Sequence, residues 1–572
     1  MRGKLDSKFT AVALIISCVF FAPAWSPADA QPQADSRASA IEQQVATAAQ
    51  SGASQIRGIP VAWPDLMLDF YQRRQFEPAW TRVDTVTQFL RALEESRDDG
   101  LDPADYNLTV LSELRADVAE ATATVQLRAE FDLLLTDALA RILYQVSFGK
   151  VDPASFIAQW NYGRVIDGVD AADVLAQMIE SADIRERIDA AKPSHPLYQG
   201  LKRELARYRE IERAGGWPLV PPGPTLKLGM TDARIPVLRS RLIASGDLAS
   251  EAVSDSSLYD EMVVQGVTHF QASVGLEPDA VVGPGTLEEL NVSASKRIDT
   301  LLVNLDRGRV LLHDLPAEFV VVNVAGFWVY LIRNGELIWQ ARAQVGTPYR
   351  STPIFRSLIT YLVFNPTWTV PPEIIRNDIL PAARRDPDSI RRKGLDVVDR
   401  NGRLVEPESV DWSAFRSGHI PYTLVQQPGP NNALGRVKFM FPNSYAVYLH
   451  DTPSKSRFEE SARAFSSGCV RVERPFELAA LLLDQPDRWN AQSIERVIQA
   501  GKLQNVSLTR KIPVLLTYWT AWVDREGRVS FRRDIYQQDS PWLAGLKRKF
   551  TVRQRPLSTA QQRNGRLMLT VT

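Results

Sequence analysis

Apolar residues recur with a helical period from Trp63 to about Leu219. The clearest stretch runs from Ala129 to Val146, where one face of the expected helix collects large apolar side chains. These side chains are Phe131, Leu134, Leu135, Ala138, Leu139 and Ile142. The pattern predicts a helical domain over residues 61–222. Residues 31–60 are rich in Ala, Gln and Ser and hold few large apolar groups, so they predict a flexible linker.

A second, smaller helical unit is predicted over residues 226–292. Apolar periodicity indicates helices at Ile235–Ser245 and Tyr259–Val274, and Gly275 to Gly283 reads as the loop that follows them. The short length of this unit predicts a compact module rather than a full domain.

After Arg297 the pattern changes from a helical period to strands. Trp328–Arg333 and Leu337–Val345 are rich in β-branched and aromatic residues, and Asn334-Gly335 between them is a strong hairpin signal. Further expected strands are Phe319–Asn323, Ser357–Val363, Tyr445–Leu449 and those within Pro513–Tyr536. We therefore predict a mainly β domain over 298–508, with C-terminal strands at 509–540 that pack on it or on the helical domain.

Residues from about 373 to 435 interrupt this β pattern. They are polar and loop-rich, and they carry a basic cluster: Arg384, Arg385, Arg391, Arg392 and Lys393. An insertion whose ends both return to the β domain is a candidate lid. We expect this lid to cover the functional site of the β domain. We also expect its basic cluster to contact an anionic substrate.

Composition narrows the class of protein. The 572 residues are 45% hydrophobic and 23% charged, which is ordinary for a globular chain of roughly three to four domains. Lys+Arg and Asp+Glu are 67 each, so no net field attracts nucleic acid. A nucleic-acid partner is therefore not expected.

The two ends of the chain differ from the rest in composition. Residues 1–30 combine a basic start, an apolar run and Ala28-Asp29-Ala30, which predicts a secretory signal peptide and export to the periplasm. An uncleaved anchor and lipidation at Cys18 are the alternatives. Cleavage would leave Cys469 as the only cysteine and no membrane span. Residues 541–572 hold basic but no acidic side chains and predict a solvated tail.

The stretch from His450 to Arg471 gathers the groups that a cysteine nucleophile needs. Cys469 follows Gly468 in a Ser-Ser-Gly turn, where backbone N–H groups can stabilise an oxyanion. His450 ends an expected strand and is the candidate general acid and base, while Arg471 can favour the thiolate. Asp451 is the nearest candidate to orient His450, through its backbone or its side chain.

The motif "HDTP", followed nineteen residues after its His by the Cys of "SSGCVR", resembles the YkuD-type L,D-transpeptidase catalytic domain. The stretches "VGTPYRSTPIF" and "FNPTWTVPPEI" resemble the large multi-domain YcbB-type members. "VLRSRLIASG", "FQASVGL" and "DAVVGPGTLEELN" resemble the three-helix peptidoglycan-binding module, with Ala280 in place of a usual Gly. Ser467 stands where the common family form has a second His.

The resemblance implies a multidomain α+β fold: a helical scaffold domain, a small peptidoglycan-binding module and a mainly β catalytic domain with an inserted lid. It implies that Cys469 forms a thioester with a peptidoglycan tetrapeptide stem, releasing D-Ala, and that a second stem accepts it in a 3→3 cross-link. Carbapenem inhibition is also implied. Tyr448, Ser467, Arg471 and Trp368 are the candidate substrate-binding residues.

This chemistry requires no metal and no organic cofactor, so none is expected. Other cell-wall synthesis enzymes are candidate partners besides the stem peptides. Two other functions remain open: an L,D-carboxypeptidase or endopeptidase that passes the same acyl-enzyme to water, and a non-catalytic wall-binding protein.

Overall fold

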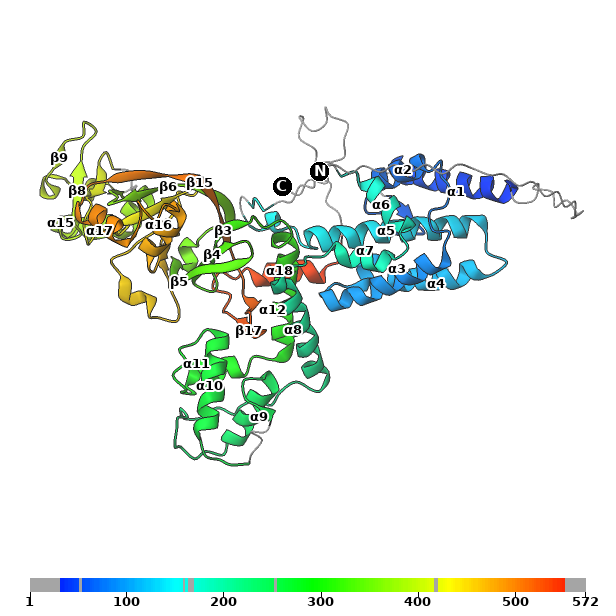
Figure 1. The fold of residues 1–572 in the computed structure, drawn as a ribbon, viewed down its shortest axis with the longest axis horizontal. Coiled ribbons are helices and arrows are strands. Elements are labelled where there is room, and N and C mark those ends of the chain that lie inside the picture. Colours follow the sequence, from blue (N-terminus) through cyan, green and yellow to red (C-terminus); the bar gives the residue numbers. More distant parts are fainter. Residues whose placement is uncertain are drawn as a thin grey trace, which may run out of the picture.

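The computed structural model describes residues 31–50, 54–157, 160–162, 169–250, 255–415 and 420–550. The expected signal peptide and residues 551–572 of the expected tail lie outside these ranges. Figure 1 shows three bodies: a helical domain, a mainly β domain at the opposite end, and a small helical module beneath their junction. The mainly β domain is the one that the sequence predicts to be catalytic, and it is called the catalytic domain below. Within the described ranges, no helix is both long and apolar enough to cross a membrane.

The helical domain is built around the long helix α5, Val125–Phe148. It shares one buried core with five shorter helices, and Leu133, Leu135 and Leu139 are fully buried. The surrounding helices are α2 (Pro64–Arg73), α3 (Val83–Glu95), α4 (Leu108–Ala119), α6 (Ala171–Glu180) and α7 (Ile184–Ala190). This arrangement agrees with the predicted helical domain.

The expectation of a flexible linker at 31–60 is wrong. Helix α1, Gln31–Gln50, packs on the helical domain, and the short strands β1 (Gln55–Ile56) and β2 (Ile59–Pro60) pair antiparallel after it. Ile41, Val45 and Ala48 are buried against the domain. Their spacing of four and three residues defines one helical face, which the Ala- and Gln-rich composition around them conceals.

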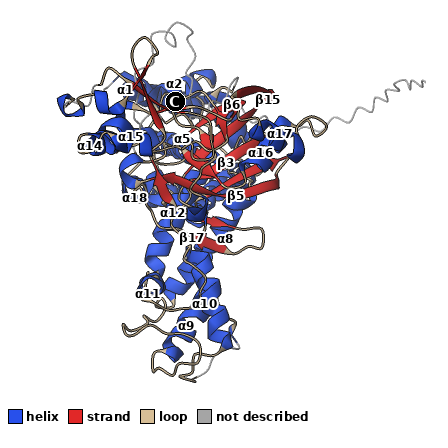
Figure 2. Ribbon diagram, turned by 90° about the vertical axis from the view of Figure 1, so that its left-hand side faces the viewer, coloured by secondary structure: helices blue, strands red, loops and turns tan. Residues whose placement is uncertain are grey.

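Two long helices join the bodies (Figure 2). Helix α8, Pro196–Arg213, belongs by sequence to the helical domain, but its buried residues share the catalytic domain's core with α12, Ala294–Leu311. The predicted boundary at residue 222 therefore separates α8 from α12, although these two helices pack together.

The beginning of the expected basic tail is also ordered. Helix α18, Asp539–Lys547, buries Trp542, whose indole N–H donates to Asp306 of α12 at 2.9 Å. Phe550 is buried beside Trp63 and Tyr144 of the helical domain. Burial of two large aromatic side chains fixes this segment. The basic composition from which a solvated tail is predicted does not indicate this burial.

The small module has its own apolar core and consists of α9 (Ile235–Ser245), α10 (Glu261–Val274) and α11 (Pro284–Leu290). Ala280, in the loop before α11, has a left-handed φ of 58°. Its backbone N–H donates to Gln271 and its carbonyl accepts from the Tyr259 hydroxyl, so both neighbours hold this conformation.

The catalytic domain is a nine-stranded sheet in the order β13-β5-β14-β12-β11-β6-β15-β3-β4, with a further β4–β5 pairing. The hairpin predicted around Asn334-Gly335 is present as β4 and β5. The strands are β3 (Glu318–Asn323), β4 (Trp328–Arg333), β5 (Glu336–Gly346), β6 (Phe355–Phe364), β11 (Val437–Met440), β12 (Leu449–His450), β13 (Ala464–Ser466), β14 (Val470–Val472) and β15 (Gln504–Thr517).

The predicted boundary between residues 508 and 509 is wrong, because it lies within strand β15. This strand lies between β6 and β3 inside the sheet and is therefore part of the catalytic domain. Only β16 (Ala521–Val523) and β17 (Val529–Phe531) form a separate hairpin. Helices α16 (Pro475–Leu483) and α17 (Ala491–Gln499) also contribute to the domain's core.

Residues 368–426 form an inserted subdomain with its own core and its own four-stranded sheet, in the order β7-β10-β8-β9. The expectation of a loop-rich insertion is therefore wrong. Its elements are β7 (Trp368–Thr369), α13 (Pro372–Ile374), a π-helical turn (Ile375–Ile379), α14 (Leu380–Ala383), α15 (Asp388–Arg392), β8 (Leu395–Val398), β9 (Leu404–Val405) and β10 (Thr423–Gln426).

Two members of the basic cluster are neutralised inside this subdomain. Arg391 pairs with Glu406 and Glu408, and Arg392 pairs with Asp386 and Asp388. The charges of Arg391 and Arg392 are therefore already paired within the subdomain, and contact between the cluster and substrate carboxylates stays a prediction.

Candidate active site

Four adjacent strands bring the site together on one face of the sheet. His450 of β12 lies opposite Lys438 of β11 on one side and opposite Arg471 of β14 on the other. Arg471 in turn lies opposite Gln344 of β5. Paired residues project to the same face, and so do residues two apart on one strand. Tyr448 therefore shares this face, and its ring lies 5.7 Å from that of His450.

Cys469 precedes β14 by one residue, which places it beside Tyr448 on the same face. Gly468 has a φ of +114°, a conformation that strongly favours glycine. The Ser466 hydroxyl accepts from the Gly468 N–H at 3.1 Å and donates to the Cys469 carbonyl, while the Thr352 hydroxyl donates to the Gly468 carbonyl at 2.8 Å. These bonds fix the turn that presents the thiol.

This turn refines the predicted oxyanion site. The N–H of Gly468 is already bound to Ser466, so it is not free to stabilise an oxyanion. The N–H of Cys469 has no hydrogen-bond partner among the described residues, and it remains the candidate donor. Gly468 contributes the turn itself.

The Cys469 thiol is partly exposed and forms no disulfide. Its low accessibility raises its pKa to about 11, because the charged thiolate loses solvation. The Tyr448 backbone N–H and the positive charges of Arg471 and Lys438 oppose this rise. At neutral pH the resting nucleophile is therefore a thiol, and a base must remove its proton during attack.

His450 is suited to be that base. Its Nδ1 lies 2.5 Å from the Asp451 carbonyl, which can only accept, so Nδ1 carries the proton of the neutral ring. A backbone hydrogen bond with Leu434 also reaches the imidazole. Burial, with the charges of Arg471 and Lys438, lowers its pKa to about 3. His450 is consequently neutral at physiological pH.

The structure distinguishes between the two ways in which Asp451 can orient His450. The Asp451 carboxylate accepts from the Arg436 backbone N–H at 2.8 Å and pairs with Lys455. Its backbone carbonyl is the group that holds the imidazole. The side chain instead fixes the chain around residues 435–436.

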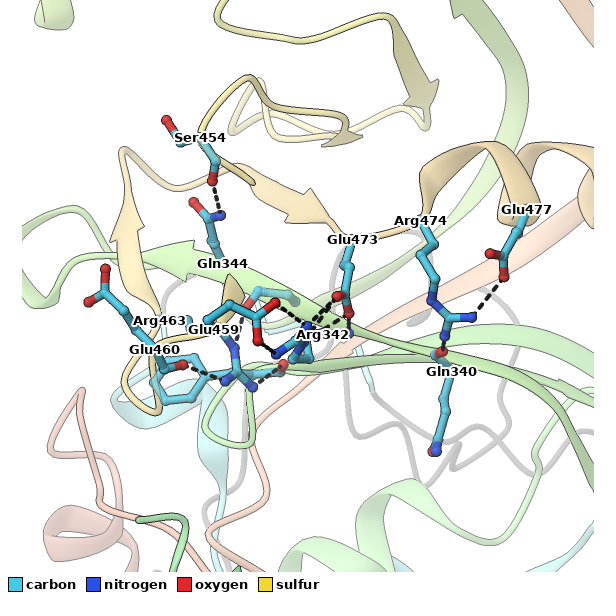
Figure 3. Close-up of polar contacts among 12 residues, drawn as sticks. Gln340, Arg342, Gln344, Ser454, Glu459, Glu460, Arg463, Glu473, Arg474 and Glu477 are labelled. Atoms are coloured by element: carbon cyan, nitrogen blue, oxygen red, sulfur yellow. Dashed lines mark hydrogen bonds and ion pairs between the residues drawn. The ribbon is translucent and has the colours of Figure 1, made fainter. Parts of the chain in front are cut away.

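The segment between His450 and Cys469 is fastened to β5 (Figure 3). Arg342 binds Glu473 on one side and Glu459 on the other, at 2.6 Å and 2.7 Å. Gln344 donates to the Ser454 carbonyl at 3.0 Å, and Arg463 donates to the Ala343 carbonyl of β5 at 3.2 Å. These contacts hold the base and the nucleophile in a common frame.

The remaining predicted substrate-binding residues lie in different places. Arg471 donates to Gln344 at 3.1 Å beside the thiol, and its Nε is buried without a hydrogen-bond partner. Ser467 is exposed and its hydroxyl accepts from Arg350 at 3.0 Å. Trp368 packs half-buried against the core of the inserted subdomain, where it pairs with Gln426.

Sequence reasoning missed Lys438, Ser466, Thr352 and Gln344. Thr352 lies within the stretch "VGTPYRSTPIF", and the resemblance of that stretch does not by itself assign a role to this residue. The signal for Lys438 is a lysine between Val437 and Phe439 in a short apolar strand. Among the described residues, no three His, Cys, Asp or Glu side chains are gathered as metal ligands would be.

Two family models match the chain. Residues 65–205 match the scaffold domain, and residues 317–494 match the L,D-transpeptidase catalytic domain of the YkuD family. The predicted helical scaffold and mainly β catalytic domain are confirmed. The site described above lies within the second match.

A Haemophilus influenzae protein, whose name assigns it provisionally to the L,D-transpeptidases, is 37% identical over 220 residues. The match covers 38% of this chain and 44% of that relative, so the chain spans less than half of the relative's length.

Solved L,D-transpeptidases of Mycobacterium smegmatis and Stackebrandtia nassauensis are 15% and 11% identical to this chain, with TM-scores of 0.18 and 0.21. The first similarity covers 35% of this chain and 58% of the other, and the second covers 52% and 96%. At these TM-scores neither similarity indicates the function.

Proposed function

We propose that this chain is a peptidoglycan L,D-transpeptidase that forms 3→3 cross-links through a thioester on Cys469. The observation that carries the proposal is a neutral His450, protonated at Nδ1, on the same sheet face as the thiol. Both residues belong to the region that matches the L,D-transpeptidase catalytic domain.

In the first half-reaction, His450 Nε2 takes the Cys469 proton as Sγ attacks the carbonyl at the L-centre of diaminopimelate in a tetrapeptide stem. The Cys469 N–H donates to the oxyanion that forms. When the C–N bond breaks, the proton passes from His450 to the departing D-Ala amine. The product is a thioester between Cys469 and the shortened stem.

In the second half-reaction, the side-chain amine of diaminopimelate on another stem attacks the thioester. His450 accepts the proton that the amine loses and returns it to the sulfur as the C–S bond breaks. A peptide bond between two diaminopimelate residues replaces the thioester. No other reactant is needed, because the energy of the first peptide bond is kept in the acyl-enzyme.

Burial sets when the proton moves, because it disfavours both the Cys469 thiolate and the His450 imidazolium. Arg471 and Lys438 favour a thiolate but disfavour an imidazolium at His450. A resting thiolate–imidazolium pair is therefore not expected, and proton transfer accompanies attack on the carbonyl.

The cellular setting is part of the same proposal. The composition of residues 1–30 supports export to the periplasm, where stem peptides are the substrates and other cell-wall synthesis enzymes are candidate partners. The small helical module, residues 226–292, supports attachment to peptidoglycan through its sequence resemblance.

The decisive experiment incubates the protein with purified tetrapeptide muropeptides and follows the products by mass spectrometry. We expect released D-Ala, an acyl-enzyme and a 3→3 dimer, and none of these with Cys469→Ala. Tripeptide without dimer would identify a carboxypeptidase that uses water as acceptor. Dimer formation by Cys469→Ala would refute the assignment of the nucleophile.

A further inference from the structure

We propose that the ammonium group of Lys438, together with the Arg471 guanidinium, forms a receptor for a carboxylate of the acyl donor beside Cys469. This inference rests on the proposed function and deepens it, because it assigns a binding role to a lysine that the cysteine–histidine chemistry does not use. The bound group is a free carboxylate close to the scissile peptide bond.

The position of Lys438 supports this role. It is half-buried on β11 directly opposite His450, and its Nζ lies 5.4 Å from the centre of the Tyr448 ring. It is close enough to Cys469 for the charges of the two groups to act on one another. An anion held there lies next to the carbonyl that the thiol attacks.

Lys438 differs from the other cations around the site in having no acidic partner. Lys455 pairs with Asp451, Arg342 with Glu473, and Arg350 with Asp378. Among the described residues, no ion pair or hydrogen bond to the Lys438 ammonium is found.

Arg471 shows the same deficit. It donates only to the neutral Gln344, and its Nε is buried without a partner among the described residues. Half-buried cations without a counter-ion are costly, so two of them on either side of His450, on the sheet face that carries the thiol, indicate an anion that arrives with a ligand.

The thiolate does not serve as this anion throughout the reaction. The resting group is a thiol and the acyl-enzyme is a neutral thioester, so negative charge on sulfur is transient. A tetrapeptide stem instead brings carboxylates within a few bonds of the scissile carbonyl, at the terminal D-Ala and on diaminopimelate. The same cations repel the protonated amine of an acceptor stem, so they favour entry of the donor first.

A first test uses two thiol reagents of similar size, anionic iodoacetate and neutral iodoacetamide, on the full chain. Lys438→Met should lower the ratio of their alkylation rates at Cys469 by about fivefold, the effect of losing one half-buried charge near the anion. Lys438→Arg should keep most of the ratio. The control Lys511→Met, which removes an exposed lysine on β15 of the same sheet, should leave it unchanged.

Lys438 also favours the thiolate, so Lys438→Met should slow both reagents by a common factor. The ratio of the two rates cancels this factor, and it equally cancels a general loss of folded protein. An unchanged ratio in Lys438→Met would overturn the proposal, because Lys438 would then act on the thiolate alone. That outcome leaves the proposed function standing, since Cys469 is still tested by its acyl-enzyme.

A second test identifies which carboxylate is bound. Three tetrapeptide donors are compared by mass spectrometry of the acyl-enzyme: the free acid, the C-terminal amide and the diaminopimelate amide. In the wild type, the amide that removes the bound carboxylate should acylate Cys469 about tenfold or more slowly than the free acid, and Lys438→Met should abolish that difference. If all three donors acylated Cys469 of the wild type at the same rate, the proposed receptor would be refuted.

Discussion

Arg350, in the loop after β5, joins Asp378 of the inserted subdomain to Ser467 of the turn that carries the nucleophile. Its guanidinium forms two bonds with the Asp378 carboxylate, at 2.5 Å and 2.9 Å, and donates to the Ser467 hydroxyl at 3.0 Å. Asp378 lies in the π-helical turn, Ile375–Ile379, and such turns are frequent at functional sites. Arg350 therefore connects the inserted subdomain to Ser467, the residue directly before Gly468 of the turn.

We predict that Asp378→Asn impairs the inserted subdomain as a substrate cover. Acylation by a tetrapeptide should fall several-fold, because the subdomain loses an ion pair that positions it, whereas iodoacetamide labelling of Cys469 should change by less than about twofold. Asp386→Asn is the matched control, since it breaks an ion pair with Arg392 inside the same subdomain. Equal loss of both activities in Asp378→Asn would indicate a purely structural role.

The pKa values at the site predict how thiol reactivity depends on pH. Because the pKa of Cys469 is raised to about 11, the thiolate fraction should increase about tenfold per pH unit between pH 7 and 10, and iodoacetamide labelling should follow it. His450→Ala should preserve this slope but slow peptide acylation by about 10² to 10⁴. A labelling rate that is already constant from pH 6 to 8 would instead reveal a resting thiolate–imidazolium pair.

Carbapenems should acylate the same thiol, because their strained carbonyl accepts the sulfur that otherwise attacks a stem peptide. Intact-protein mass spectrometry should show a single adduct, and peptide mapping should place it on Cys469. Cys469→Ala should show none. An adduct that persists in this variant would place the reactive group elsewhere.

Ser466→Ala should destabilise the catalytic domain and slow acylation together. The change leaves the buried Gly468 N–H without its acceptor, at a cost of about 1–3 kcal/mol, and releases the Cys469 carbonyl. Denaturant unfolding and acyl-enzyme formation measure the two effects. Ser467→Ala, at an exposed hydroxyl one residue away, should change the free energy of unfolding by less than about 0.5 kcal/mol.

Ala280→Gly should stabilise the small helical module. Ala280 has a left-handed φ of 58°, and replacing it with glycine should relieve about 1 kcal/mol of backbone strain after the entropy of the unfolded chain is counted. Ala272→Gly, at an exposed position inside α10, should destabilise by about 1 kcal/mol instead. Hydrogen exchange of the module's amides separates the two, and a loss of protection in Ala280→Gly would contradict the prediction.

Local patterns in the sequence predicted what local physics determines. The hairpin of β4 and β5 follows from alternating side chains and the Asn334-Gly335 turn, and α9 follows from its apolar face. The expected strand at Tyr445–Leu449 was mostly wrong, because the Asn443 side chain binds the N–H groups of Tyr445 and Val447 and bends the chain. Only Leu449–His450 enters the sheet there.

The residues of the site also fall into those that the sequence predicted and those that only the structure placed there. Cys469 and His450 stand out in the sequence because a reactive thiol and an imidazole follow a spacing that resembles a known motif. The partners of these residues come from β5, β11 and the loop at Thr352, more than a hundred residues from Cys469 in two of these cases. Which strand lies beside which, and in what register, depends on burial of a shared core that no local pattern contains. Only the tertiary structure therefore placed Lys438, Gln344 and Thr352 around the turn that carries the thiol.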